Sequence, residues 1–186
     1  MKPSRAGYPT QRFLELARAT MDGNPLTARL HDKLEALAVA AGETAELSVR
    51  DQQDVVYVDA VECTAPIRYF AKVGERWAIQ TTSSGKAILT SYDPTERGRI
   101  LHSLHYLPTH ARNAEELSAE LEASIRRGWC EDLAESTPDV MGLGVPVVSG
   151  GRRYGLAVAG PIYRMLSKRD ELVAHLRAAA AGIGAL

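Results

Sequence analysis

Apolar residues recur at helical spacing over the first forty positions of the chain. Between Pro9 and Met21 they fall on one face, and residues 22–25 (DGNP) form a strong stop and turn. A second stripe consists of Leu26, Leu30, Leu34, Leu37 and Ala41. It ends at Gly42, a typical helix C-terminal residue. The pattern predicts two helices, and a leucine stripe of this kind needs a cover, which favours a dimer or higher oligomer.

After Gly42 the period changes from helix to strand. Residues 43–50 alternate between polar and apolar, and a polar turn at 51–54 joins them to the apolar run 55–61. Two such runs predict an antiparallel hairpin. A further strand is expected at 68–73, before a short strand-like run at 77–79.

Residues 74–91 (GERWAIQTTSSGKAILTS) lead from that short run into a helix expected to begin at Gly85. Thr82 or Ser83 is the expected N-cap. The N–H groups of a first helical turn also attract anions, so capping and ligand binding are both possible. A nucleotide-binding P-loop is excluded, because Gln80 and Ala87 stand where that motif needs glycine and Ser or Thr.

The rest of the chain alternates helices and strands in blocks. Helices are expected from 93 to 104 and from 113 to 128, and strands at 129–133, 141–148 and 154–159, with a break at 160–161. Ser167 is expected to cap a last helix, with Asp170 completing a capping box. Clustered strands with segregated helices predict an α+β fold, an antiparallel sheet with flanking helices.

Composition narrows the classes of protein that fit this pattern. The 186 residues are 45% hydrophobic and 24% charged, with a net charge of −1. Without a basic excess, this chain alone is not expected to bind DNA specifically. Cys63 and Cys130 lack metal or redox spacing, which indicates reduced thiols and a cytoplasmic protein. No apolar run has the length of a membrane span.

Six collinear motifs resemble the effector-binding domain of the IclR family of bacterial transcription regulators. They are GETAELSV (42–49), VVYVDAVE (55–62), SGKAILTSYDP (84–94), RGW (127–129), VPV (145–147) and LAVAGP (156–161). The resemblance implies a GAF- or profilin-like sheet at 43–186, after a helical linker or dimerisation segment at 1–42. Family members carry a winged helix-turn-helix before the linker, so we expect contact with DNA only through such a domain, absent from this chain.

The resemblance also implies a binding site. The family's pocket positions correspond here to Ser83, Ser84, Asp132, Gly142, Ala157 and Ala159, and the predicted site also includes Thr82, Gly85 and Leu143. The family has serines where Ala157 and Ala159 stand, and often cysteine where Gly142 stands. We therefore expect a roomier, more apolar pocket for a small organic acid, aromatic or otherwise bulkier than a keto acid, held by its carboxylate at residues 82–85. For Asp132, an exposed acid at a strand end is the alternative.

Enzyme and metal functions find little support in the sequence. His102, His105 and His110 lack an accompanying ligand pattern, so ordinary surface histidines are expected and no metal or cofactor is predicted. Candidate nucleophiles such as Cys130 lack a catalytic signature. The hypothesis is therefore the sensing domain of a homodimeric or tetrameric regulator, with ligand-dependent oligomer geometry controlling DNA binding. The alternative is a free-standing GAF-like binding protein or enzyme with no DNA-binding partner.

Overall fold

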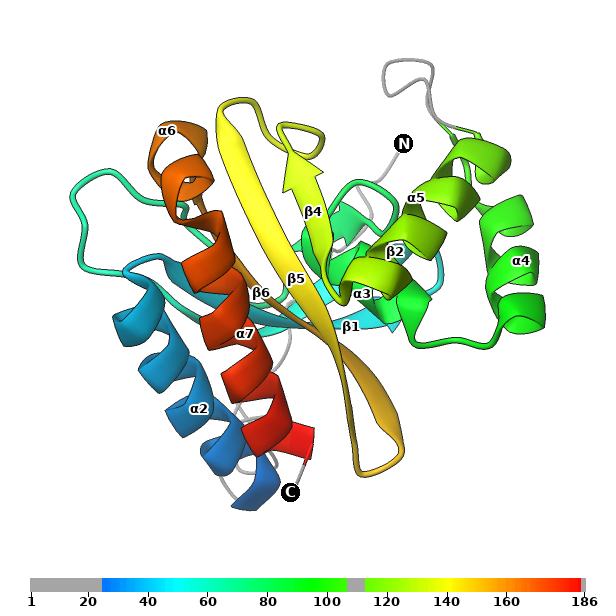
Figure 1. Ribbon diagram of the computed structural model, residues 1–186. Coiled ribbons are helices and arrows are strands. Elements are labelled where there is room, and N and C mark those ends of the chain that lie inside the picture. The colour runs from blue at the N-terminus through cyan, green and yellow to red at the C-terminus, as the bar shows by residue number, and fades with distance from the viewer. Residues whose placement is uncertain (1–24, 107–112, 185–186) are drawn as a thin grey trace, which may run out of the picture.

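A six-stranded antiparallel sheet forms the centre of the molecule (Figure 1). The computed structural model describes residues 25–106 and 113–184, with side chains omitted at 25–29 and 184. The strands are β1 (Thr44–Asp51), β2 (Asp54–Val61), β3 (Arg76–Ala78), β4 (Cys130–Leu133), β5 (Val140–Ser149) and β6 (Arg152–Pro161). Their order across the sheet is β3-β2-β1-β6-β5-β4. The predicted α+β class is confirmed. The expected helix at 9–21 and His110 lie outside the described residues.

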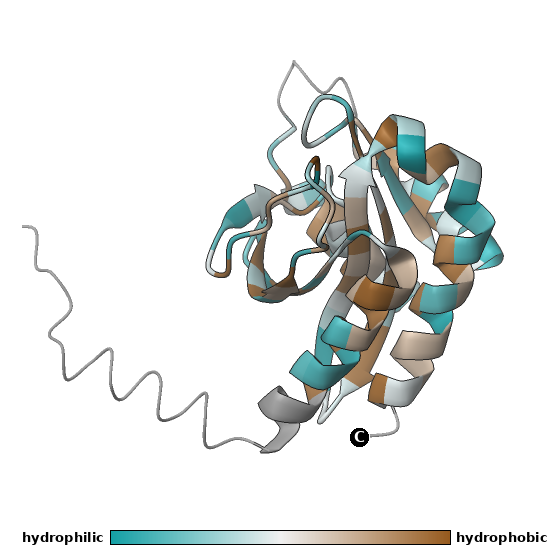
Figure 2. Ribbon diagram, turned by 90° about the vertical axis from the view of Figure 1, so that its left-hand side faces the viewer, coloured by the Kyte–Doolittle hydropathy of each residue, from teal (hydrophilic) through white to brown (hydrophobic). Residues whose placement is uncertain are grey.

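Two helices, α2 (Pro25–Ala41) and α7 (Arg169–Gly184), lie side by side over one face of the sheet (Figure 1). Leu30, Leu34 and Leu37 of α2 are at most 6% exposed and belong to the same apolar core as Leu47 and Val158. Figure 2 shows hydrophilic and hydrophobic residues interspersed along this helix, and Val39 is 84% exposed. Over the described side chains, the leucine stripe is thus covered within the chain, so the stripe by itself gives no argument for an oligomer.

The other face carries the helices of the middle of the chain. These are α3 (Ser83–Thr90), α4 (Pro94–Ser103) and α5 (Ala114–Arg127). A second apolar core lies there, and it includes Ile88, Leu101 and Leu121. The N-caps Asp93 and Asn113, where these two helices were expected to begin, accept backbone N–H groups in the first turns of α4 and α5. These locally encoded ends fix where each helix starts.

Strand alternation assigns each side chain of β1 to one of these faces. Ala45 and Leu47 face the core under α2 and α7, while Thr44, Glu46 and Ser48 alternate with them. All five are at most 3% exposed. A strand that the sequence predicted as half-buried is therefore buried on both faces over these residues.

Three local predictions were wrong. Residues 68–73 form no strand but part of the connection between β2 and β3, where the Thr44 hydroxyl donates to the Tyr69 carbonyl at 2.6 Å. β6 continues through the expected break to Pro161. Ser167 does not cap α7. It lies in the 3₁₀ turn η2 (Leu166–Lys168) after α6 (Ile162–Met165), and its hydroxyl donates to the Arg164 carbonyl at 3.2 Å.

Candidate functional site

Strand register aligns four of the nine predicted site residues in two rows across the sheet. One row runs Thr44, Ala159, Gly142, Asp132, and the next runs Glu46, Ala157, Gly144. Directly paired residues of antiparallel strands point to the same face. Small residues on β5 and β6 therefore form a floor, with an acid from β4 at one end and polar residues of β1 at the other.

Helix α3 begins directly on this floor. A Cβ added to Gly142 would lie 2.6 Å from Oγ of Ser83, and one added to Gly144 would lie 2.5 Å from the Ser83 carbonyl oxygen. At Gly155 a Cβ would overlap the Ser84 carbonyl oxygen. The glycines thus allow the helix to approach the sheet closely. The expectation that Gly142 leaves free volume is wrong, because Ser83 occupies that space.

The hydroxyl groups at the start of α3 have partners within the protein. Thr82 is the N-cap and its Oγ1 accepts from the Gly85 N–H at 3.0 Å, so α3 begins at Ser83 rather than at Gly85. The Ser84 hydroxyl donates to Oε1 of Glu46, also at 3.0 Å. All of these residues are buried. The helix start is therefore a desolvated polar centre rather than an exposed cap.

Asp132 is 3% exposed, so the alternative of an exposed strand-end acid is wrong. Its Oδ1 accepts the N–H of Glu135 at 2.8 Å and that of Ser136 at 3.3 Å, and its Oδ2 accepts the Ser136 hydroxyl. Burial is the main cause that raises the pKa of this carboxyl, against these hydrogen bonds. Asp132 thus closes the turn after β4 while it borders the floor.

Glu46 is a further acid of the site that sequence reasoning missed. Its side chain is 2% exposed, and burial raises its pKa to about 7. Oε2 has no hydrogen-bond partner among the residues that the structure describes. The sequence feature that could have revealed Glu46 is an acid at an alternating position of a strand, but the alternation predicts that the polar side of this strand faces solvent.

Two tyrosines lie beside Glu46. Tyr57 of β2 and Tyr69 of the β2–β3 connection approach each other through their hydroxyl oxygens, which are 3.2 Å apart. Burial raises the pKa of both phenols, and the charge of Glu46 raises it further. An aromatic, partly polar wall thus adjoins the floor.

Lys86 connects the start of α3 to neighbouring elements. Its side chain is fully buried, and Nζ lies 2.8 Å from Oε1 of Glu120, 2.7 Å from Oε1 of Glu135 and 2.9 Å from the Glu131 carbonyl oxygen. Glu120 belongs to α5, and Glu135 lies in the turn that Asp132 closes. The ammonium group therefore holds the helix start and the acidic turn in fixed positions.

Leu143 lies apart from the other predicted site residues. Its side chain is fully buried in the core under α2 and α7, on the opposite face from Gly142 and Gly144. Strand alternation requires this, because adjacent residues point to opposite faces. We therefore leave its side chain out of the candidate site.

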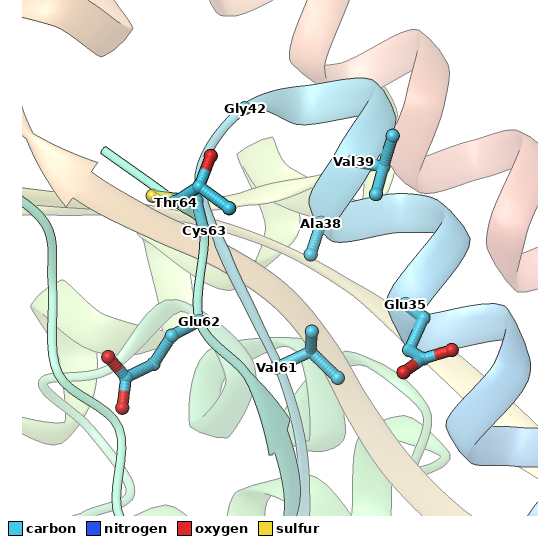
Figure 3. Close-up of a pocket in the computed structure, with 8 residues that line it drawn as sticks. All are labelled: Glu35, Ala38, Val39, Gly42, Val61, Glu62, Cys63 and Thr64. Atoms are coloured by element: carbon cyan, nitrogen blue, oxygen red, sulfur yellow. The ribbon is translucent and has the colours of Figure 1, made fainter.

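A separate hollow of about 380 Å³ lies between the end of α2 and the end of β2 (Figure 3). Ala38, Val39 and Val61 give it apolar walls, while Glu35 and Glu62 lie on opposite sides. Cys63 also borders it and is 8% exposed. The sequence did not predict this hollow, and it lies away from the start of α3.

Residues 25–106 and 113–184 contain neither a metal-ligand cluster nor a membrane-spanning helix. No group of three or more His, Cys, Asp or Glu side chains there could hold a metal ion. No described helix has both the length and the apolar character needed to cross a membrane.

Comparison with known proteins gives concordant matches. The family described as "Bacterial transcriptional regulator IclR C-terminal" matches residues 18–185. The chain is 32% identical over 168 residues to a probable transcriptional regulator, SauR, of Cupriavidus necator, covering 88% of this chain and 66% of that protein. It is 26% identical over 185 residues to the HTH-type transcriptional regulator KdgR of Escherichia coli, covering 95% and 69%.

Solved structures show the same fold. The crystal structure of the Thermotoga maritima IclR aligns with a TM-score of 0.82 at 26% identity, over 95% of this chain and 74% of that one. The C-terminal domain of E. coli KdgR aligns with a TM-score of 0.74 at 26% identity, over 86% and 96%. The chain thus spans about two thirds of the length of the curated relatives named above, and nearly all of a solved C-terminal domain.

Proposed function

Because the chain belongs to the IclR C-terminal family of bacterial transcriptional regulators, we propose that it is the small-molecule-sensing part of such a regulator. The relatives carry the names of transcriptional regulators, which favours a sensor over the alternative of a free-standing binding protein or enzyme. DNA contact would be made by a helix-turn-helix domain outside this sequence, in the cytoplasm. Effector binding would alter the geometry of a homodimer or tetramer.

The buried polar centre at the start of α3 is the observation that carries this proposal. Ser84 and Glu46 are hydrogen-bonded at 3.0 Å, and Asp132 is buried across a floor of small residues. Burying this many polar groups costs free energy that packing alone would avoid. Such a centre is therefore expected to serve recognition.

The proposed ligand is a small organic acid, aromatic or otherwise bulkier than a keto acid. Its carboxylate would bind at residues 82–85, where the first N–H groups of α3 and the positive end of the helix dipole favour an anion. The rest of the ligand would lie over Ala157 and Ala159, and Ser83, Gly142 and Asp132 would border it. The Thr82 and Ser84 hydroxyls would have to exchange partners, so binding would also change local contacts of α3.

Calorimetric titration with aromatic and short aliphatic acids tests this proposal. Ser84→Ala should weaken binding about 10- to 100-fold, because a hydrogen bond to a charged group contributes roughly 1.5–3 kcal/mol. Ala159→Leu should abolish binding, because the larger side chain would occupy the space above the floor where the ligand is proposed to lie. Ser103→Ala and Ala178→Leu, at exposed helical positions, are matched controls that should bind like the natural chain. Equal affinity of all five proteins for an identified acid would place the site elsewhere.

A further inference from the structure

An unpaired acceptor lies at the side of the proposed effector site. Oε1 of Glu46 accepts the Ser84 hydroxyl at 3.0 Å, whereas Oε2 has no hydrogen-bond partner among the described residues. The side chain is only 2% exposed. Buried carboxyl oxygens are normally paired, so an unpaired one at a candidate site indicates a missing donor.

No described neighbour of Glu46 places a donor in hydrogen-bonding geometry with Oε2. A hydrogen bond from the Tyr57 hydroxyl of β2 lowers the pKa of Glu46, and this hydroxyl oxygen also lies 3.2 Å from that of Tyr69, yet Oε2 remains without a partner in hydrogen-bonding geometry among the described residues. The charged groups that act on Glu46 are Asp132 of β4 and Glu75 before β3, and both are acids that raise its pKa. The surroundings therefore suit a donor or a cation brought by a ligand.

We propose that Glu46 contacts the effector directly and selects organic acids that carry a hydroxyl or ammonium group on the carbon beside the carboxylate. This inference rests on the proposed function, because it takes the carboxylate to bind at the start of α3. Ser84 lies in the first turn of α3 and touches Glu46. An anion at that turn and Oε2 of Glu46 are thus neighbours, and a donor on the adjacent carbon can reach the unpaired oxygen.

Two matched series of acids test the selection by calorimetry. Propionate, lactate and alanine differ only in bearing hydrogen, hydroxyl or ammonium at the second carbon, and 3-phenylpropionate, phenyllactate and phenylalanine repeat this on a bulkier skeleton. We expect the substituted acids of one series to bind at least about tenfold more tightly than the unsubstituted one.

Variants of Glu46 separate the two donors. Glu46→Met should remove the gain in affinity that the hydroxyl and ammonium substituents give. Glu46→Gln keeps a neutral acceptor, so it should retain part of the gain from the hydroxyl group but lose the gain from the ammonium group. Glu171→Met, at an exposed position of α7, is the control and should change nothing. Thermal melts and circular dichroism would establish that each variant is folded.

Proton release provides a second measurement. An ammonium group beside Glu46 favours its charged carboxylate, whereas a ligand carboxylate alone disfavours it. The ammonium-bearing acids should therefore release a fraction of a proton on binding near pH 7 and the unsubstituted acids should not, as read from titrations in two buffers of different ionisation enthalpy. The Glu46→Gln variant should release none. Asp132, Glu75, Tyr57 and Tyr69 remain in that variant, so release that persists would belong to them and overturn the assignment to Glu46.

The outcomes distinguish this inference from the proposed function. Substituted and unsubstituted acids of equal affinity, or an advantage that survives in Glu46→Met, would overturn the inference. If Ala159→Leu still abolished binding in that case, the proposed function would stand. If none of the six acids bound the natural chain, the organic-acid proposal would fail, and the inference with it.

Discussion

The backbone carbonyl of Ser84 in α3 lies directly against Gly155 in β6, so close that a Cβ at residue 155 would overlap it. The residue has no positive φ that would itself require glycine. Close packing of the helix start on the sheet therefore explains the glycine. The geometry of the candidate site depends on this contact between elements far apart in the sequence.

Gly155→Ala should destabilise the chain. The obstacle is backbone rather than a flexible side chain, and overpacking of this kind costs about 1–3 kcal/mol. Gly98→Ala is the matched control, since a Cβ there meets nothing within 4 Å in the middle of α4. It should stabilise the chain by about 0.5–1 kcal/mol through helix propensity. Urea denaturation of both variants measures the two changes. If Gly155→Ala had the same free energy of unfolding as the natural chain, α3 would be able to move away from the sheet.

Lys86→Met should be strongly destabilising. The variant leaves Glu120 and Glu135, only 22% and 18% exposed, without the ammonium group between them. Breaking a buried ion pair from one side costs about 3–5 kcal/mol. Lys72→Met, at an exposed position, should stay within about 0.5 kcal/mol of the natural chain. Chemical denaturation compares them, and equal stability of the two variants would contradict a structural role for Lys86.

The sequence predicts local features of this site well. Helix starts at Thr82, Asp93 and Asn113 depend on side chains that bond backbone groups within three residues, and all three were recognisable. The leucine stripe of α2 was also recognised, but its periodicity shows only that it is covered and not by what. Here the sheet and α7 cover it.

Long-range features escaped prediction for physical reasons. The role of Glu46 depends on Ser84 and on the register of β1 with β6, neither of which alternation reveals. Residues 68–73 have strand-like composition but make tertiary bonds, such as that from Thr44 to Tyr69, instead of a ladder. Gly142 was interpreted as free volume because the helix residue that fills the space, Ser83, is distant in sequence.

Arg164→Ala should loosen the connection between β2 and β3. Arg164 binds both carboxylate oxygens of Glu43, which is 3% exposed, and Nη2 donates to the Ile67 carbonyl at 3.1 Å. Loss of the partner should cost about 3 kcal/mol, since a buried carboxylate is left uncompensated. Amide hydrogen exchange near residue 67 should accelerate.

Two comparisons check the role of Arg164. Lysine lacks the planar fork, so Arg164→Lys should recover only part of the protection near residue 67. Arg152→Ala, at the exposed first residue of β6, should leave exchange near residue 67 unchanged. Unchanged exchange in Arg164→Ala would mean that other contacts hold the connection in place.

The last prediction concerns pH. Burial raises the pKa of Glu46 from its ordinary 4.5 to about 7 in the folded chain. The folded state thus holds a proton that the unfolded state releases above pH 4.5. The contribution of Glu46 to the stability of the folded chain is fully present below pH 4.5 and is lost progressively as pH rises through 7.

Glu46→Gln replaces the protonated acid with a neutral group of similar shape and should remove this loss. Its free energy of unfolding should be close to that of the natural chain at pH 4.5 and exceed it by up to about 3 kcal/mol at pH 8. The neighbouring acid Asp132 titrates in both proteins, so their difference isolates Glu46. Urea denaturation at several pH values between 4.5 and 8 measures it, with Glu171→Gln as an exposed control that should track the natural chain. A difference between Glu46→Gln and the natural chain that is constant over this range would show that Glu46 titrates normally and is solvated.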